Sequence, residues 1–130
     1  MNLGKELEII LRPTRAEQLW LGIRQSFWDA LREIFVRHPD VEAVVVFGSR
    51  ARQTHHRGSD IDLCVFGRDY NSASQDQISS EIEELFYPWK VDIIHWERSA
   101  SPRWRNEVRR DALLLFNRFS STDLPVQLNL

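Results

Sequence analysis

Residues 41–66, VEAVVVFGSRARQTHHRGSDIDLCVF, contain two short apolar runs separated by a polar stretch. The first run, 41–47, is rich in valine and nearly continuous, which is typical of a strand buried on both faces. A second strand is predicted over 60–66, DIDLCVF, and ends at Gly67. The connection between the two strands is longer than a plain hairpin needs, and long connections in compact domains are often functional. The polar stretch is therefore where chemistry is expected.

Two carboxylates open the second predicted strand. Residues i and i+2 of a strand point to the same face, so Asp60 and Asp62 share one face. Close carboxylates repel each other unless a cation lies between them, and Mg²⁺ accepts such ligands while leaving positions open for substrate phosphates. Asp92, the second residue of a third predicted strand at 91–96, can join them, and three carboxylates on neighbouring strands can hold two cations ~3.5–4 Å apart. The alternative is that these aspartates cap turns and face solvent.

A Gly-Ser turn follows the first predicted strand. Gly48 permits backbone angles or close approaches that a side chain would block, and Ser49 adds a hydroxyl donor. Such a turn, leading into a short helix, presents backbone N–H groups to an anion. Arg50, Arg52 and Arg57 would raise the local potential for a phosphate-bearing substrate. Arg50 and Arg52 are candidate nucleotide ligands, although arginines at such positions are more often solvated helix residues.

The rest of the chain predicts helices on either side of these strands. Thr14 and Glu17 have capping-box spacing, and the helix that follows them should stop before Pro39. Apolar periodicity predicts further helices over 74–87 and 102–118. The resulting order is helix, strand, turn, strand, helix, strand, helix, which predicts an α/β (α+β) fold with a small sheet flanked by helices. We expect a single domain over 1–130, with its core at about 15–118 and an irregular tail at 119–130.

Composition limits the classes of protein. The chain has 130 residues and a formal net charge of −2, so direct nucleic-acid binding through bulk positive charge is not expected. One cysteine, Cys64, excludes an internal disulfide and a cysteine-based zinc cluster. No apolar run approaches the ~20 residues that span a bilayer, and the N-terminal stretch is a poor signal peptide. We therefore expect a cytoplasmic protein without membrane contact.

The spacing of the singled-out residues resembles that of a known superfamily. Gly48-Ser49, ten residues and then Asp60-Ile61-Asp62 form the GS-x10-DxD pattern of the polymerase-β-like nucleotidyltransferases. The short length, the continuation GSRAR…GSDIDL and the later VDII closely resemble the minimal nucleotidyltransferase (MNT) family. The resemblance covers about residues 15–118, and its specific part is 47–63 together with Asp92. It implies a mixed-sheet fold, dependence on Mg²⁺ and transfer of a nucleoside monophosphate with release of pyrophosphate.

The resemblance also implies roles and a partner. Gly48 and Ser49 would hold the β and γ phosphates of ATP, Asp60 and Asp62 would bind two Mg²⁺ ions, and Asp92 would bind the ion that activates the acceptor oxygen. Many members of the family are MntA-like antitoxins paired with a helical HEPN-type ribonuclease toxin, and they transfer AMP to a tyrosine on it. The expected function is therefore transfer of AMP from ATP to an acceptor hydroxyl, in particular to a tyrosine of a HEPN-type partner.

Two other functions stay open. Larger relatives modify antibiotics or RNA ends, and a homo-oligomer could supply the pocket that a small-molecule or RNA acceptor needs. A non-catalytic antitoxin would instead neutralise its toxin by contact alone. There is also one departure from the family pattern, because Gln53 stands where many relatives carry a glycine after the second arginine. Gln53 removes no metal ligand, but it could alter the turn that follows the short helix.

Overall fold

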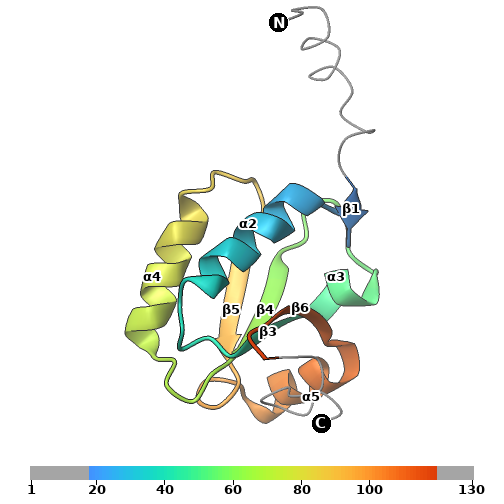
Figure 1. Ribbon diagram of the computed structural model, residues 1–130. Helices are drawn as coiled ribbons and strands as arrows, with labels where there is room; N and C mark the ends of the chain where they lie inside the picture. The colour runs from blue at the N-terminus through green and yellow to red at the C-terminus, as the bar shows by residue number, and fades with distance from the viewer. Residues whose placement is uncertain (1–17, 120–130) are drawn as a thin grey trace, which may run out of the picture.

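The structure, a computed structural model, describes residues 18–119 (Figure 1). Its central sheet has the strand order β5-β4-β3-β6. The strands are β3 Ala43–Phe47, β4 Ile61–Phe66, β5 Val91–His95 and β6 Leu113–Asn117. β3 runs antiparallel to β4 and β6, whereas β4 and β5 are parallel. The predicted small mixed sheet flanked by helices is confirmed.

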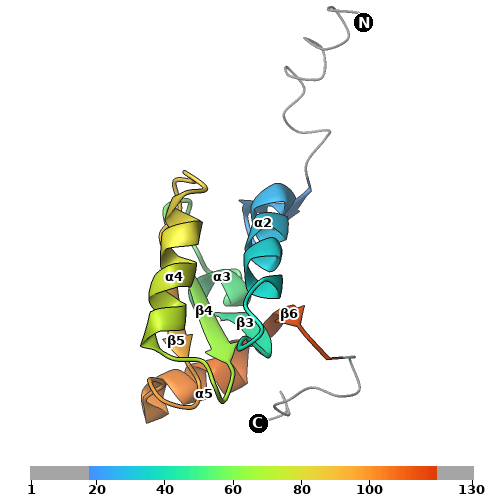
Figure 2. The same ribbon diagram turned by 60° about the vertical axis from the view of Figure 1, so that its left-hand side comes forward.

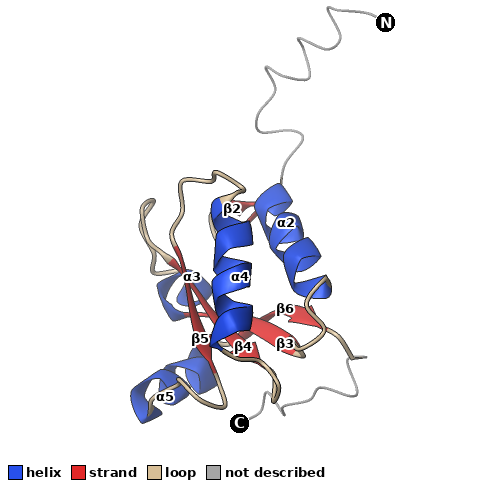
Figure 3. Cartoon of the chain, turned by 90° about the vertical axis from the view of Figure 1, so that its left-hand side faces the viewer, coloured by secondary structure: helices blue, strands red, loops and turns tan. Residues whose placement is uncertain are grey.

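Helices cover both faces of the sheet. α2 Gln25–Val36 and α4 Ser72–Glu83 pack on one face, and α5 Pro102–Asp111 packs on the other, as Figures 2 and 3 show. α3 Gly48–Arg52 is a short helix that directly continues β3.

The alternation of side chains along β4 decides which residues meet which helices. Ile61, Leu63 and Val65 are buried with α2 and α4, whereas Cys64 and Phe66 are buried on the side of α5. Because alternate residues share a face, Asp62 belongs to the α5 side. The core on the α2 and α4 side is the larger of the two.

The chain before α2 differs from the prediction. A continuous helix up to Pro39 is wrong for residues 18–24, because β1 Leu19–Trp20 and β2 Ile23–Arg24 pair there as an antiparallel hairpin. The two turn residues between them have φ of 54° and 78°, and positive φ at both central residues is the mark of a type I′ turn. Trp28 Nε1 donates to the Trp20 carbonyl at 2.9 Å and holds the hairpin against α2.

The apolar spacing before α2 explains the error. Trp20 and Ile23 are three positions apart, which suits one face of a helix as well as the two strands of a tight hairpin. Gly22 supplies the turn, and it is the signal that the helical periodicity obscured. The predicted capping pair Thr14 and Glu17 lies outside the described residues.

The last predicted helix is wrong beyond Asp111. α5 ends there because Ala112 leaves the helical region, with φ −51° and ψ 124°, and residues 113–117 form β6 along the edge of β3. A run of consecutive apolar residues suits either a strand or a helix, so the open edge of β3 decides the outcome. Arg118 then fixes the end of β6, since it donates to the carbonyls of Val41, Phe35 and His38 at 2.8, 3.0 and 2.9 Å.

The α4 helix is shorter than predicted. It ends at Glu83, and the residues up to Lys90 form a loop in which Phe86 has φ 56°. Phe86 is 90% exposed, whereas Tyr87 and Trp89 pack against Phe27 of α2. Within residues 18–119, none of the helices combines the length and apolar character required to cross a bilayer.

Candidate active site

The three predicted aspartates lie at one edge of the sheet. Asp60 directly precedes β4, and the parallel register of β4 and β5 places Asp62 beside Asp92. On its other side, Asp62 pairs with Phe47, the last residue of β3. The end of β3, the start of β4 and the start of β5 therefore converge on Asp62.

Gly48 is required where β3 turns into α3. Its φ is 79°, and a Cβ built on it would lie 2.4 Å from Asp62 Oδ2. A side chain here would occupy the space of the carboxylate. The N-cap residue of α3, Phe47, makes no side-chain hydrogen bond to the helix. The first N–H groups of α3, including that of Ser49, are the kind of backbone donors that attract anions.

The surroundings of the Asp62 carboxyl group at this edge raise its pKa. Burial, together with the charges of Asp92, Asp60 and Glu107, raises its pKa to about 6, while the charge of Arg52 opposes this shift. Carboxylates that disfavour one another's ionisation in this way would be relieved by a cation.

The donor set suits a hard cation in its chemistry, because oxygen ligands from several carboxylates are what Mg²⁺ accepts. Within residues 18–119, however, no three His, Cys, Asp or Glu side chains already converge in a ready-made metal site. Asp92 Oδ1 instead faces Lys90 Nζ at 3.5 Å, in a pair that is well exposed to solvent. Binding of a cation by all three aspartates would require Asp92 to leave Lys90.

Arg50 is buried, and its guanidinium is directed at backbone carbonyls. It donates to the carbonyls of Leu21 at 3.0 Å, Arg57 at 3.2 Å and Ser59 at 2.8 Å. Burial lowers the pKa of Arg50, and the charge of Asp60 partly offsets this. These contacts tie the β1–β2 hairpin to the residues just before Asp60. They do not support the prediction that Arg50 binds the nucleotide, and they indicate a positioning role instead.

Arg52 also binds another side chain of this protein. Its Nη1 donates to Asp111 Oδ2 at 2.6 Å, which joins α3 to the end of α5. Arg110 contacts the same carboxylate, with Nε 2.8 Å from Oδ1. Burial would raise the pKa of Asp111, but the hydrogen bonds from Arg110 and Arg52 outweigh it and lower the pKa. Arg52 still acts on Asp62 through its charge.

Glu107 is a member of the site that sequence reasoning missed. It lies on α5, and its charge reaches Asp62 from the helix that covers that face. Arg103 Nε lies 4.0 Å from Glu107 Oε1. The sequence around it is rich in arginine and is typical of a solvated helix face, so no local pattern marked Glu107. Only the packing of α5 on the sheet brings it to the aspartates.

Gln53, the departure from the family pattern, ends α3. It adopts the left-handed conformation, with φ 60° and ψ 34°. Glycine is favoured at this position of a helix end because it has no Cβ to strain the backbone. The turn forms with glutamine all the same, and Thr54 N donates to the Ser49 carbonyl at 2.9 Å.

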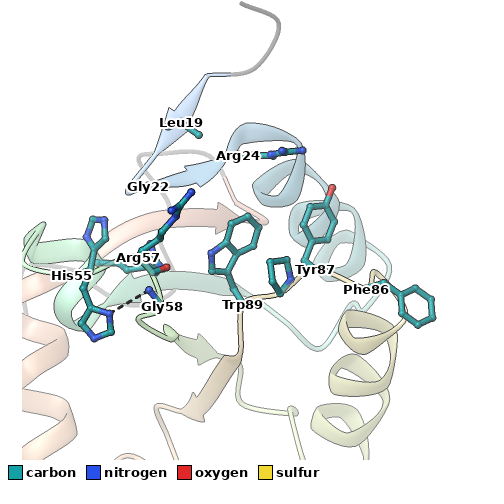
Figure 4. A pocket seen from close by; sticks show the side chains of 12 residues that line it. Leu19, Gly22, Arg24, His55, Arg57, Gly58, Phe86, Tyr87 and Trp89 are labelled. Atoms are coloured by element: carbon teal, nitrogen blue, oxygen red, sulfur yellow. Dashed lines mark hydrogen bonds between the residues drawn. The ribbon is translucent and has the colours of Figure 1, made fainter. Parts of the chain in front are cut away.

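A cavity lies next to this edge, and none of the three aspartates lines it. It has a volume of about 930 Å³. It is bounded by the β1–β2 hairpin, the loop before β4 and the loop before β5 (Figure 4). Cys64, by contrast, is a buried core residue, and burial raises the pKa of its thiol well above the usual range.

Solved structures with a similar fold include chains from toxin–antitoxin complexes. A chain of a toxin–antitoxin crystallised with AMP-PNP has a TM-score of 0.61 and 20% identity, covering 75% of this chain and 77% of that chain. A chain of the tri-AMPylated Shewanella oneidensis HEPN toxin in complex with its MNT antitoxin has a TM-score of 0.55 and 17% identity, covering 72% and 71%. A chain of an MntA–HepT toxin–antitoxin has a TM-score of 0.54 and 17% identity, covering 72% of each chain. At identities of 17–20%, these structural similarities establish the fold alone.

Sequence comparison gives the family itself. A search among curated proteins finds no match. Residues 29–120 match the family model described as polymerase beta, nucleotidyltransferase. That range holds β3 with its Gly-Ser turn and all three aspartates. Because the match spans well over half of the chain, the protein belongs to the polymerase beta nucleotidyltransferase family.

Proposed function

We propose that the protein transfers AMP from ATP to a hydroxyl group, and that the acceptor is a tyrosine of a HEPN-type toxin. The observation that carries the proposal is the Asp62 carboxylate lying against the Gly48 turn, with Asp60 and Asp92 at the same edge. A turn that offers N–H groups beside a set of carboxylates suits a metal-bound triphosphate.

The acceptor is proposed from the similar folds. One of the structures with this fold contains a tri-AMPylated HEPN toxin in complex with an MNT antitoxin, and another contains AMP-PNP. A chain with the same fold and a carboxylate edge of this kind is suited to the same pairing. The single cysteine and the use of ATP agree with a cytoplasmic location.

Each residue of the site would have its own role in the reaction. Asp60, Asp62 and Asp92 would hold Mg²⁺, which would neutralise phosphate charge and favour a reactive acceptor oxygen. The N–H groups of Gly48 and Ser49 would hold the β and γ phosphates. The acceptor oxygen forms a bond to the α-phosphorus, the bond from that phosphorus to the bridging oxygen breaks, and pyrophosphate leaves. We assign acceptance of the hydroxyl proton to Asp92.

Arg50 contributes by position. Its hydrogen bonds to the Arg57 and Ser59 carbonyls hold the chain that leads into Asp60. Because the same guanidinium also holds the Leu21 carbonyl, the hairpin and the carboxylate edge form one connected unit. Lysine could not replace it, since a single ammonium cannot span three carbonyls in this fork geometry.

The experiment is an adenylylation assay with Mg²⁺ and α-labelled ATP. The purified protein is incubated with a lysate of its source organism, in parallel with Asp62→Asn and with Asp69→Asn, an exposed aspartate away from the edge. Label on one lysate protein with the wild type and Asp69→Asn, but not with Asp62→Asn, supports transfer. Mass spectrometry of that protein should find an adenylyl group on tyrosine, and label on another residue type or on RNA would contradict the proposed acceptor.

A non-catalytic antitoxin is the second candidate. It is favoured by the pairing of Asp92 with Lys90 and by the lack of three converged metal donors within residues 18–119. For this candidate, Asp62→Asn should still capture and neutralise the toxin as well as the wild type does, with no label on any protein. Loss of neutralisation in Asp62→Asn with an intact complex would exclude it.

A further inference from the structure

The cavity beside the aspartate edge has an unusual lining, and we name it the basic aromatic pocket. Its lining includes the basic and aromatic residues Arg24, Arg50, His55, His56, Arg57, Tyr87 and Trp89. Among the described residues 18–119, no aspartate or glutamate lines it, although the chain has 19 acidic and 17 basic residues. Its volume of about 930 Å³ lies within the roughly 300–1,000 Å³ of typical small-molecule sites.

One wall of the pocket is a fixed aromatic platform. The rings of Tyr87 and Trp89 are stacked, with centroids 5.8 Å apart and planes 20° apart. Phe27 of α2 supports both, with its centroid 4.5 Å from Tyr87 and 5.6 Å from Trp89. Both rings are only half-buried, so a flat ligand can reach them without disturbing the core.

The facing wall carries positive charge and free donors. Arg57 is exposed, and its side chain forms no ion pair with any described carboxylate. His55 packs against Gly22 of the hairpin, and its buried Nδ1 has no hydrogen-bond partner among the described residues. Figure 4 shows Arg57 and Trp89 both reaching toward the hairpin from the base of the pocket, whereas Phe86 points away.

An aromatic platform opposite cations selects a ligand with a flat ring and an anionic group. We infer that the basic aromatic pocket binds a nucleoside phosphate, with its base on Trp89 and its phosphate at Arg57 and His55. The base would stack on the indole, and a guanidinium is the preferred partner of a phosphate. A carboxylate-rich peptide would use the cations but would leave the platform without a partner. The nucleoside phosphate can be a free nucleotide or the terminal nucleotide of an RNA strand.

This site goes beyond the proposed transfer and is separate from the Gly48–Ser49 turn. None of the three aspartates lines the pocket. The two sites are nevertheless neighbours, because Arg57 precedes Asp60 by three residues and Trp89 precedes Asp92 by three. Arg50 connects the two sites, because it donates a hydrogen bond to the Arg57 carbonyl and the charge of Asp60 affects its pKa.

The test is calorimetric titration of the full chain with AMP in the presence of EDTA, where no metal-bound nucleotide can form. Arg57→Glu is the test variant. Arg98→Glu is the control, because it makes the same charge change on an exposed residue beyond the opposite end of β5. We expect Arg57→Glu to weaken AMP binding about tenfold or more, while Arg98→Glu and Asp62→Asn bind as the wild type does.

Further titrations distinguish a free nucleotide from an RNA end and test an acidic peptide as the alternative ligand. Binding of AMP assigns a free nucleotide, whereas binding of a short RNA with a terminal phosphate, but not of AMP, assigns an RNA end. Equal binding by Arg57→Glu and the wild type would overturn the inference, as would equal loss in Asp62→Asn or binding of an acidic tyrosine-containing peptide alone. The outcome is independent of the transfer assay, because neither acceptor nor Mg²⁺ is present.

Discussion

Removing the charge of Asp62 should abolish activity and yet stabilise the metal-free protein. Burial, with the charges of Asp92, Asp60 and Glu107, raises the pKa of this carboxyl from its ordinary 3.8 to about 6. The folded state therefore holds the proton more tightly than the unfolded state, and stability falls as pH rises through this range. The difference corresponds to about 3 kcal/mol at 1.36 kcal/mol per pKa unit. Because Asp62 is only half-buried, solvent screening reduces this to about 1–2 kcal/mol.

The assay is urea unfolding of Asp62→Asn and the wild type in EDTA, at pH 7.5 and at pH 4. At pH 7.5 the variant should be more stable by about 1–2 kcal/mol, and the gain should shrink at pH 4, where the wild-type carboxyl is largely protonated. Added Mg²⁺ should stabilise the wild type and leave the variant unchanged. Asp69→Asn, which removes an exposed charge, should show neither effect. A variant that is less stable at pH 7.5, or equally stabilised by Mg²⁺, would refute this account of the site.

Three further substitutions test the elements around the site. Gln53→Gly should stabilise the protein by about 0.5–1 kcal/mol because it relieves the left-handed strain, whereas Gln77→Gly, on the exposed face of α4, should cost about 1 kcal/mol; thermal unfolding measures both. Gly48→Ala should cost about 1–2 kcal/mol through its positive φ, and its Cβ should also displace the neighbouring carboxylate, which loss of Mg²⁺-induced stabilisation would report. Asp111→Asn should cost about 2 kcal/mol at pH 7. Since the pKa of Asp111 is lowered in the folded state, this loss should diminish as pH falls below 4, as unfolding across pH would show.

The sequence predicts the parts of the fold that are decided locally. β3 and β4 are recognisable because short apolar runs that contain β-branched residues and end at a glycine are typical of strands. α2 ends before Pro39, as predicted. β6 is not recognisable, because an apolar run at 113–117 becomes a strand only where β3 offers an open edge. The hairpin before α2 is missed for a related reason, since a two-residue strand has no periodicity of its own.

The same division applies to the site. The sequence identifies Asp60 and Asp62 as site residues because they share one face of a strand. It identifies Asp92 by its place near the start of the next strand. The charge of Glu107 acts on Asp62 only because α5 packs on the sheet, and no spacing along the chain encodes that proximity. The aromatic platform likewise depends on a loop that follows a helix shorter than predicted.

The arginines near the Gly-Ser turn illustrate what a sequence motif leaves undecided. Arg50 and Arg52 invite assignment to phosphate, yet one holds three carbonyls of the surrounding loops and the other holds a buried carboxylate on α5. A long polar connection leaves backbone carbonyls that must find donors, and a buried guanidinium supplies several at once. With both arginines engaged in this way, the backbone N–H groups of α3 supply little charge against a triphosphate. Under the proposed function, neutralisation of the phosphates would come chiefly from cations held by the aspartates, so we expect activity to depend steeply on Mg²⁺ and only indirectly on these arginines.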